Sequence, residues 1–249
     1  MSGARQAGWL AAGTLVLGLA LVACRGEGSA EPPANSGPAP DTGAPAVTGG
    51  ALRYVALGDS YTIGTSVGTS ERWPDQLVAA LGPEPPSLTL LANVAVNGFT
   101  SGDVMDVELP QLEALSPEFV SLLIGVNDVV RGVPEVTFRR NVTTILDDLV
   151  ARVGPERIVV VTTPDYTVTP AGAEFGDPAQ QAANIRDFNA AMTTMAEARG
   201  IVVVDIHDIS LRAAADSSLV AGDGLHPSGA QYALWVERIL PVVGALLGR

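Results

Sequence analysis

The feature that most constrains the fold is an alternation of short apolar runs with amphipathic stretches along residues 51–249. The apolar runs are rich in β-branched residues and nearly continuous, as expected of parallel strands covered on both faces. These runs span residues 53–57, 88–95, 119–124, 157–162 and 201–205. The helical stretches span residues 73–81, 103–115, 135–153, 178–199 and 228–247. This alternation predicts a three-layer α/β/α sandwich around a five-stranded parallel sheet with right-handed crossovers.

Small and polar residues follow the first three predicted strands. They occupy residues 58–60, 97–100 and 125–128. Because ligands bind at the carboxyl ends of the strands in open α/β sheets, we expect these three segments to meet at one site.

Three residues in these and later segments have the chemistry of a serine hydrolase. A serine hydroxyl is a poor nucleophile unless a neighbouring base takes its proton, and Ser60 directly follows a buried strand. The candidate base is His226, one of only two histidines in the chain. Asp223 lies three residues before it, where a tight turn lets a carboxylate reach Nδ1 and leaves Nε2 free for the serine.

The oxyanion that forms when a serine attacks a carbonyl needs hydrogen-bond donors. The candidate donors are the backbone N–H groups of Ser60 and Gly98 and the side-chain amide of Asn127. Asp59 and Asp128 adjoin two of these positions, and we expect them to support the rim of the site by capping a helix or bracing a loop.

Four segments carry a resemblance to a known family: YVALGDSYTIG, NVAVNGFTSGDV, LLIGVNDV and GDGLHPS. They resemble, in order, the four sequence blocks of the SGNH (GDSL-like) hydrolases, and the similarity covers residues 52–247. By this resemblance Ser60 matches the nucleophile, Asp223 and His226 match the acid and the base, and Gly98 and Asn127 match the oxyanion-hole residues. The chain departs from the GDSL motif only in having a tyrosine in place of its leucine.

The resemblance implies a flavodoxin-like fold and a carboxylic ester hydrolase that works through an acyl-enzyme, without a metal or an organic cofactor. We expect the protein to be a monomer. Esters of small molecules, lipids and acylated glycans are all compatible with it. Two alternatives remain open. One is an acyltransferase that uses the same triad, and the other is a non-catalytic surface binding module.

The first fifty residues predict export and a tether. An apolar run over residues 7–23 ends at Cys24, the single cysteine, and residues 21–24 resemble a bacterial lipobox. We therefore expect a signal peptide with a lipobox in residues 1–24, and the hydrolase domain in residues 51–249. Residues 25–50 are rich in proline, glycine, alanine and serine, which is typical of a flexible linker. The protein would then be an extracytoplasmic lipoprotein of the cell membrane, although an uncleaved anchor or a plain signal peptide remains possible.

Charge and cysteine content narrow the possible partners. The formal net charge is −13, so a phosphate backbone would be repelled and we expect no nucleic-acid partner. A single cysteine excludes an intrachain disulfide and a zinc–thiolate cluster.

Several further residues invite functional interpretations that we consider weaker. Ser66 lies in a GxSxG pattern, but no strand precedes it as that motif requires, so we reject it as the nucleophile. His207 is expected to be a structural loop histidine. The loop over residues 164–178 is unusually long, and we expect it to shape the substrate pocket. Phe99, Tyr61 and Tyr166 are candidates for its apolar walls.

Overall fold

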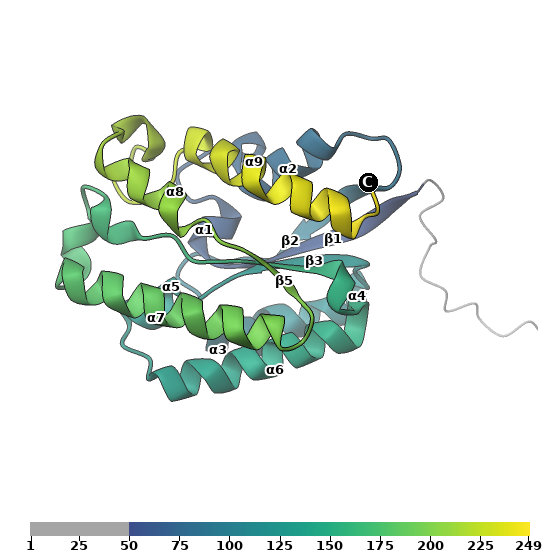
Figure 1. Ribbon diagram of the computed structural model, residues 1–249, viewed down its shortest axis with the longest axis horizontal. Coiled ribbons are helices and arrows are strands. Elements are labelled where there is room, and N and C mark those ends of the chain that lie inside the picture. Colours follow the sequence, from purple (N-terminus) through teal and green to yellow (C-terminus); the bar gives the residue numbers. More distant parts are fainter. Residues whose placement is uncertain (1–49) are drawn as a thin grey trace, which may run out of the picture. The chain divides into compact units, whose positions relative to one another are not determined.

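The computed structural model describes residues 50–249, which form a parallel sheet between two layers of helices (Figure 1). The sheet has five strands in the order β2-β1-β3-β4-β5, and each neighbouring pair is parallel. This order places the first strand inside the sheet, and the strand order reverses beside it, as in flavodoxin-like folds. The prediction of a five-stranded α/β/α sandwich is confirmed.

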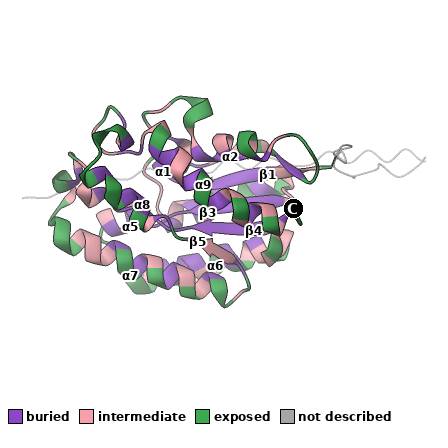
Figure 2. Cartoon of the chain, turned by 45° about the horizontal axis from the view of Figure 1, so that its top comes forward, coloured by how far each residue is buried: buried purple, intermediate pink, exposed green. Residues whose placement is uncertain are grey.

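The strands lie where the apolar runs predict them, within a few residues at each end. Their bounds are Ala51–Gly58 for β1, Ser87–Asn93 for β2, Phe119–Leu123 for β3, Ile158–Val161 for β4 and Val202–Val204 for β5. Every residue of β3 and β4 is buried, whereas the edge strands β2 and β5 are partly exposed. Figure 2 shows this buried centre of the sheet between half-exposed helices. Continuous apolar sequence therefore corresponds to the strands that are covered on both faces.

Four long helices form most of the two outer layers. Helices α2 (Trp73–Leu81) and α9 (Gly229–Leu246) pack together on one face, and α6 (Glu135–Val153) and α7 (Pro178–Glu197) pack together on the other (Figure 1). Side chains cap two of them, since Asp177 accepts from the Gln180 N–H before α7 and Ser228 accepts from the Gln231 N–H before α9. None of the helices in residues 50–249 has the length and apolar character needed to cross a membrane.

The helix predicted over residues 103–115 is broken into four short pieces. They are α3 (Ser101–Asp103), a π-type turn (Val104–Glu108), a 3₁₀ turn (Leu109–Gln111) and α4 (Leu112–Leu115). Pro110 lies in the 3₁₀ turn and has no N–H to donate to the preceding turn, so a regular α-helix cannot continue through it. The wide π-type turn brings the Glu108 side chain into the interior, where its Oε2 accepts a hydrogen bond from the Gly58 N–H at 2.9 Å.

Three short helices follow strands and escape prediction from the sequence. They are α1 (Ser60–Ile63), α5 (Val126–Val130) and α8 (His207–Leu211), and they follow β1, β3 and β5 respectively. Each has four or five residues, which is too few to show helical periodicity. The remaining 3₁₀ turns are Thr69–Glu71, Pro155–Arg157, Tyr166–Val168, Gly172–Phe175, Arg212–Ala214 and Ser217–Leu219.

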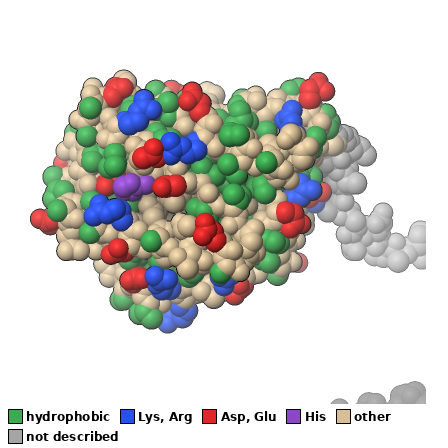
Figure 3. Space-filling model, viewed as in Figure 1, with side chains coloured by type: hydrophobic (Ala, Val, Ile, Leu, Met, Phe, Trp, Pro, Cys, Tyr) green, Lys and Arg blue, Asp and Glu red, His purple; other side chains and the backbone are tan. Residues whose placement is uncertain are grey.

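Charges of both signs are interspersed on the face of the molecule seen in Figure 3. Arginines pair with carboxylates over the helices, as Arg199 does with Asp147 and Arg238 does with Asp208. Such exposed pairs contribute little to stability, because solvent and salt screen them. The negative net charge of the chain is thus not gathered into one acidic field on this face.

Candidate active site

The candidate nucleophile occupies the first position of α1, directly after β1. Ser60 is 4% exposed, and Asp59 before it caps the helix by accepting from the Tyr61 N–H at 3.0 Å. Gly58 makes the sharp turn possible, because its φ is +148° and a Cβ there would lie 2.3 Å from the Leu123 carbonyl oxygen. Sequence and backbone geometry together therefore project the Ser60 side chain at the carboxyl end of the sheet.

The candidate base and acid lie on a tight loop between residues 220 and 227. An antiparallel bridge between Val220 and Pro227 closes this loop, and the Ala221 N–H donates to the His226 carbonyl at 2.7 Å. Asp223 Oδ1 accepts from the backbone N–H of His226 at 3.0 Å, and its Oδ2 lies 2.6 Å from His226 Nδ1. A carboxylate at that distance holds the proton on Nδ1, so Nε2 is left as the proton acceptor.

The electrostatic state of Asp223 suits that role. Partial burial opposes its ionisation, but hydrogen bonds from Ser66, from the imidazole and from two backbone N–H groups outweigh this effect. The pKa of the Asp223 carboxyl therefore lies well below its usual range. It is ionised at neutral pH and can stabilise a positive imidazolium.

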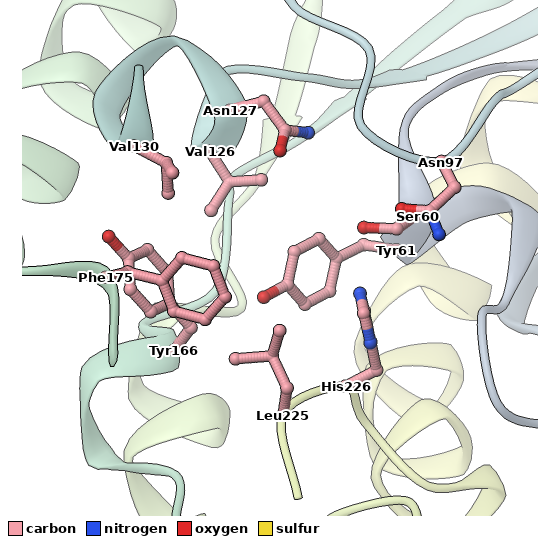
Figure 4. Close-up of a pocket in the computed structure, with 10 residues that line it drawn as sticks. All are labelled: Ser60, Tyr61, Asn97, Val126, Asn127, Val130, Tyr166, Phe175, Leu225 and His226. Carbon is pink, nitrogen blue, oxygen red and sulfur yellow. The ribbon is translucent and has the colours of Figure 1, made fainter. Parts of the chain in front are cut away.

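Ser60 and His226 share one pocket with a volume of about 150 Å³. In Figure 4 the far nitrogen of the His226 ring points toward the Ser60 hydroxyl, while Asn127 lies across the pocket and Asn97 lies beside Ser60. These side chains come from the segments after β1, β2 and β3 and from the late loop. The expectation that the segments following the first three strands meet at one site is confirmed.

The other side of the pocket is apolar and largely aromatic. Its lining residues are Tyr61, Val126, Val130, Tyr166, Phe175 and Leu225 (Figure 4). Tyr166 and Phe175 belong to the long loop after β4 and meet edge to face, with ring centroids 5.7 Å apart. The expectation that this loop shapes the pocket is confirmed. Of the three candidate wall residues, Tyr61 and Tyr166 line the pocket, whereas Phe99 does not and Phe175 lines it instead.

The candidate oxyanion donors lie near this pocket, and one of them already has a partner. Asn127 donates one amide N–H to the Phe99 carbonyl at 2.9 Å, and the other lies 3.5 Å from Asp59 Oδ2. A contact of 3.5 Å is weak, so the second N–H is only weakly bonded within the protein. Gly98 has φ +83°, and its carbonyl accepts from Arg131 at 2.6 Å, which fixes the backbone around its N–H.

Residues 56–234 match the model of the GDSL-like lipase/acylhydrolase family, which is more than half of the chain. The chain belongs to this family. The expectation of a carboxylic ester hydrolase is thereby confirmed at the level of the family.

Individual relatives of this GDSL-like chain share only part of its sequence. An arylesterase from Vibrio mimicus is 30% identical over 95 residues, which are 38% of this chain and 46% of that relative. The alignment thus spans about half the length of the relative.

Solved structures share the fold. TesA aligns with a TM-score of 0.62 at 18% identity, covering 78% of this chain and 99% of TesA. Axe2, an acetylxylan esterase from Geobacillus stearothermophilus, aligns with a TM-score of 0.61 at 19% identity, covering 79% and 95% of the two chains. A lipolytic protein of the G-D-S-L family from Veillonella parvula gives 0.62 at 17% identity, covering 77% and 98%.

The two supporting aspartates of this GDSL-like chain are buried and braced. Asp128 accepts from the backbone N–H and the hydroxyl of Ser101, at 2.8 and 2.5 Å, and Asn141 donates to the same hydroxyl at 3.0 Å. Burial raises the pKa of Asp128, and complete burial raises the pKa of Asp59 to about 8. Asp59 caps α1, and Asp128 fixes the segment that follows Gly98, as the sequence leads us to expect.

Two residues set aside in the sequence have different surroundings in this GDSL-like fold. His207 begins α8, and its Nε2 lies 3.6 Å from Asp165 Oδ2, outside the pocket that Ser60 lines. Ser66 also lies outside that pocket, but its hydroxyl donates to Asp223 Oδ2 at 2.6 Å. Nothing in the sequence signals this contact, because 157 residues separate the two side chains.

Proposed function

We propose that this chain hydrolyses carboxylic esters with short acyl groups, using Ser60, His226 and Asp223. The observation that carries the proposal is the 2.6 Å contact between His226 Nδ1 and the low-pKa carboxylate of Asp223, at the edge of the pocket that Ser60 lines. A nucleophile, a base and a group that orients the base are the parts that acyl transfer requires.

The reaction would proceed through two acyl-transfer steps. Ser60 Oγ attacks the carbonyl carbon while His226 Nε2 takes its proton, and the carbonyl electron pair moves onto oxygen. The N–H groups of Ser60 and Gly98 and the amide of Asn127 would hold this oxyanion. When the oxyanion collapses, the bond to the alcohol oxygen breaks and His226 returns the proton to the leaving alcohol. Water then attacks the acyl-Ser60 ester in the same way and releases the acid.

Pocket size supports a small acyl group. A cavity of about 150 Å³ is large enough to hold benzene, which has six heavy atoms. The apolar side chains opposite Ser60 would favour burial of such a group. The similarity to an arylesterase and the shared fold with an acetylxylan esterase agree with small aryl or acetyl esters.

A panel of p-nitrophenyl esters tests this proposal. We expect kcat/KM to be higher for the acetate and butyrate than for the octanoate, and Phe175→Ala to shift the preference toward octanoate. A fluorophosphonate should inactivate the protein and label Ser60, as located by peptide mass spectrometry. Labelling at another serine, or no turnover of any ester, would contradict the proposal. Repeating the assay with an alcohol acceptor separates hydrolysis from acyl transfer by its products.

We also propose that the domain is attached to the outer face of the cell membrane through a lipid on Cys24. Residues 1–49 lie outside the described residues, so this proposal rests on the lipobox-like sequence at residues 21–24 and the apolar run before it. Stable attachment takes at least two lipid chains or one chain with a second signal. Mass spectrometry of the protein from its host should find an N-terminal Cys24 bearing lipid. An unmodified N-terminus further along the chain would exclude the tether.

A further inference from the structure

Ser66 is placed to act on the candidate catalytic pair from outside the pocket. Its hydroxyl donates to Asp223 Oδ2 at 2.6 Å, and the same oxygen lies 2.6 Å from His226 Nδ1. We propose that Ser66 is a positioning residue that holds Asp223 and thereby orients His226 toward Ser60. This inference rests on the proposed function, because it assigns a role within that reaction.

The loop that carries Ser66 is continuous with the helix that carries the nucleophile. The backbone N–H groups of Gly64 and Thr65 both donate to the Ser60 carbonyl at 3.0 Å. The Val67 N–H in turn donates to the Gly64 carbonyl at 3.3 Å. Ser60 and Ser66 are thus parts of one hydrogen-bonded unit, so the Ser66 hydroxyl links the nucleophile segment directly to the loop of the base.

The other oxygen of Asp223 is held by its own loop. Asp223 Oδ1 accepts from the backbone N–H groups of Leu225 and His226, at 2.9 and 3.0 Å. These bonds fix the carboxylate relative to residues 220–227 but not relative to Ser60. Ser66 supplies a hydrogen bond to Asp223 from the nucleophile's side of the site. Without it, the distance between base and nucleophile would depend on packing between the two loops.

The backbone conformation of Ser66 is unusual for a residue with a side chain. Ser66 has φ +69°, in the left-handed region that favours glycine. Within residues 50–249, Ser116 is the one other non-glycine residue with a positive φ. A glycine would relieve this strain but would remove the hydroxyl. Comparing Ala and Gly at this position therefore separates loss of the hydroxyl from loss of stability.

Ser66→Ala and Ser66→Gly test the proposal against Ser70→Ala, an exposed serine in the same stretch of chain. Hydrogen bonds to charged groups justify an expected fall in kcat of about 10-fold for both Ser66 variants. KM should stay nearly unchanged, because Ser66 does not line the pocket. The melting temperature of Ser66→Gly should exceed that of Ser66→Ala, because both variants lose the hydroxyl and only glycine relieves the positive φ. Ser70→Ala should behave as wild type. Full kcat in both Ser66 variants would overturn the proposal.

A double-mutant cycle shows whether the effect passes through Asp223. Ser66→Ala should cost about 10-fold in the wild-type background and almost nothing further in Asp223→Asn. An equal loss in both backgrounds would mean that Ser66 acts in another way.

The pH profile of kcat/KM provides a readout that a purely structural role would not move. Without the Ser66 donor, Asp223 stabilises the imidazolium more strongly, so the acid limb should move to higher pH. The titratable groups that interact with the pair are Tyr61 from α1 and Tyr232 from α9. Neither of them contacts Ser66 through a hydrogen bond that the substitution removes, so their contribution is common to both profiles.

The NMR signal of the proton on His226 Nδ1 tests the same contact without turnover. The chain has only two histidines, so His207→Ala assigns the signal. The signal should shift in both Ser66 variants and not in Ser70→Ala. An unchanged signal would overturn the role of Ser66 even if the protein hydrolyses no ester, whereas a shifted signal with no hydrolysis would contradict only the proposed function.

Discussion

Ser60→Ala is expected to lower kcat/KM for p-nitrophenyl acetate by about 10⁴- to 10⁶-fold, the loss seen when a serine hydrolase loses its nucleophile. The loss is this large because, within residues 50–249, the other hydroxyls that line the pocket are the phenols of Tyr61 and Tyr166. Burial raises the pKa of Tyr61 well above its usual value and that of Tyr166 to about 12, so neither phenol is a ready nucleophile. The measurement is initial-rate hydrolysis, with circular dichroism to show that the fold is kept.

A second substitution tests whether Ser60 and His226 act together. His226→Ala should cost nearly as much as Ser60→Ala, and the double variant should be no worse than either alone, because the two groups act as a unit. Ser70→Ala is the matched control and should retain full activity. Multiplicative losses in the double variant would mean that Ser60 and His226 belong to separate functions.

Glu108→Gln is expected to make the domain more stable than wild type at alkaline pH and about equally stable near pH 5. Burial raises the pKa of Glu108 to about 9, and the nearby carboxyl of Asp59 raises it further. A carboxyl whose pKa is raised by folding keeps its proton in the folded state after the unfolded chain has lost it. Wild type therefore loses stability as pH rises from the unfolded pKa, near 4.3, toward about 9. Glutamine does not titrate, and its carbonyl can still accept from the Gly58 N–H.

The size of this effect follows from linkage. The stability difference between the variant and wild type should grow by up to about 1.4 kcal/mol for each pH unit in that range. Melting temperatures measured from pH 5 to pH 9 provide the test, at about 2–4 °C per kcal/mol for a domain of this size. Glu113→Gln on α4 is the control, because this side chain is almost fully exposed. If the pH curves for Glu108→Gln and wild type run parallel, the buried carboxyl does not titrate as described.

The layers of this fold could be predicted because the spacing of apolar residues follows which faces of each strand and helix are buried. The runs at β3 and β4 are apolar throughout, and α2 and α6 begin and end where the helical pattern does. The exceptions are local. Pro110 breaks a pattern that otherwise indicates one helix, and helices of four or five residues such as α1 carry no pattern at all. The spacing of apolar side chains does not reveal where a backbone hydrogen bond is missing at a proline.

Some residues of the candidate site could be predicted from the sequence, and others could not. Ser60, Asp223 and His226 are recognisable because the motifs place them next to strands or within one turn. Ser66 and Phe175 reach the site through loop conformations, and their contacts join segments far apart in the chain. Glu108 is charged and lies in an amphipathic stretch, so its sequence suggests an exposed side chain, and only the π-type turn explains its burial. Tertiary contacts of this kind are set by loop geometry, which local sequence does not specify.

The direction of β1 places the amino end of the domain and the pocket at opposite edges of the sheet. Chain entering at Gly50 meets the amino end of the strand, whereas Ser60 follows its carboxyl end, eight strand residues or about 26 Å further on. Helix α9 runs back along the sheet, so residue 249 also lies at the amino-end edge, where Arg249 donates to the Leu81 carbonyl (Figure 1). A reporter or a solid support coupled at either place would thus lie at the edge of the sheet opposite the pocket and would not cover its mouth.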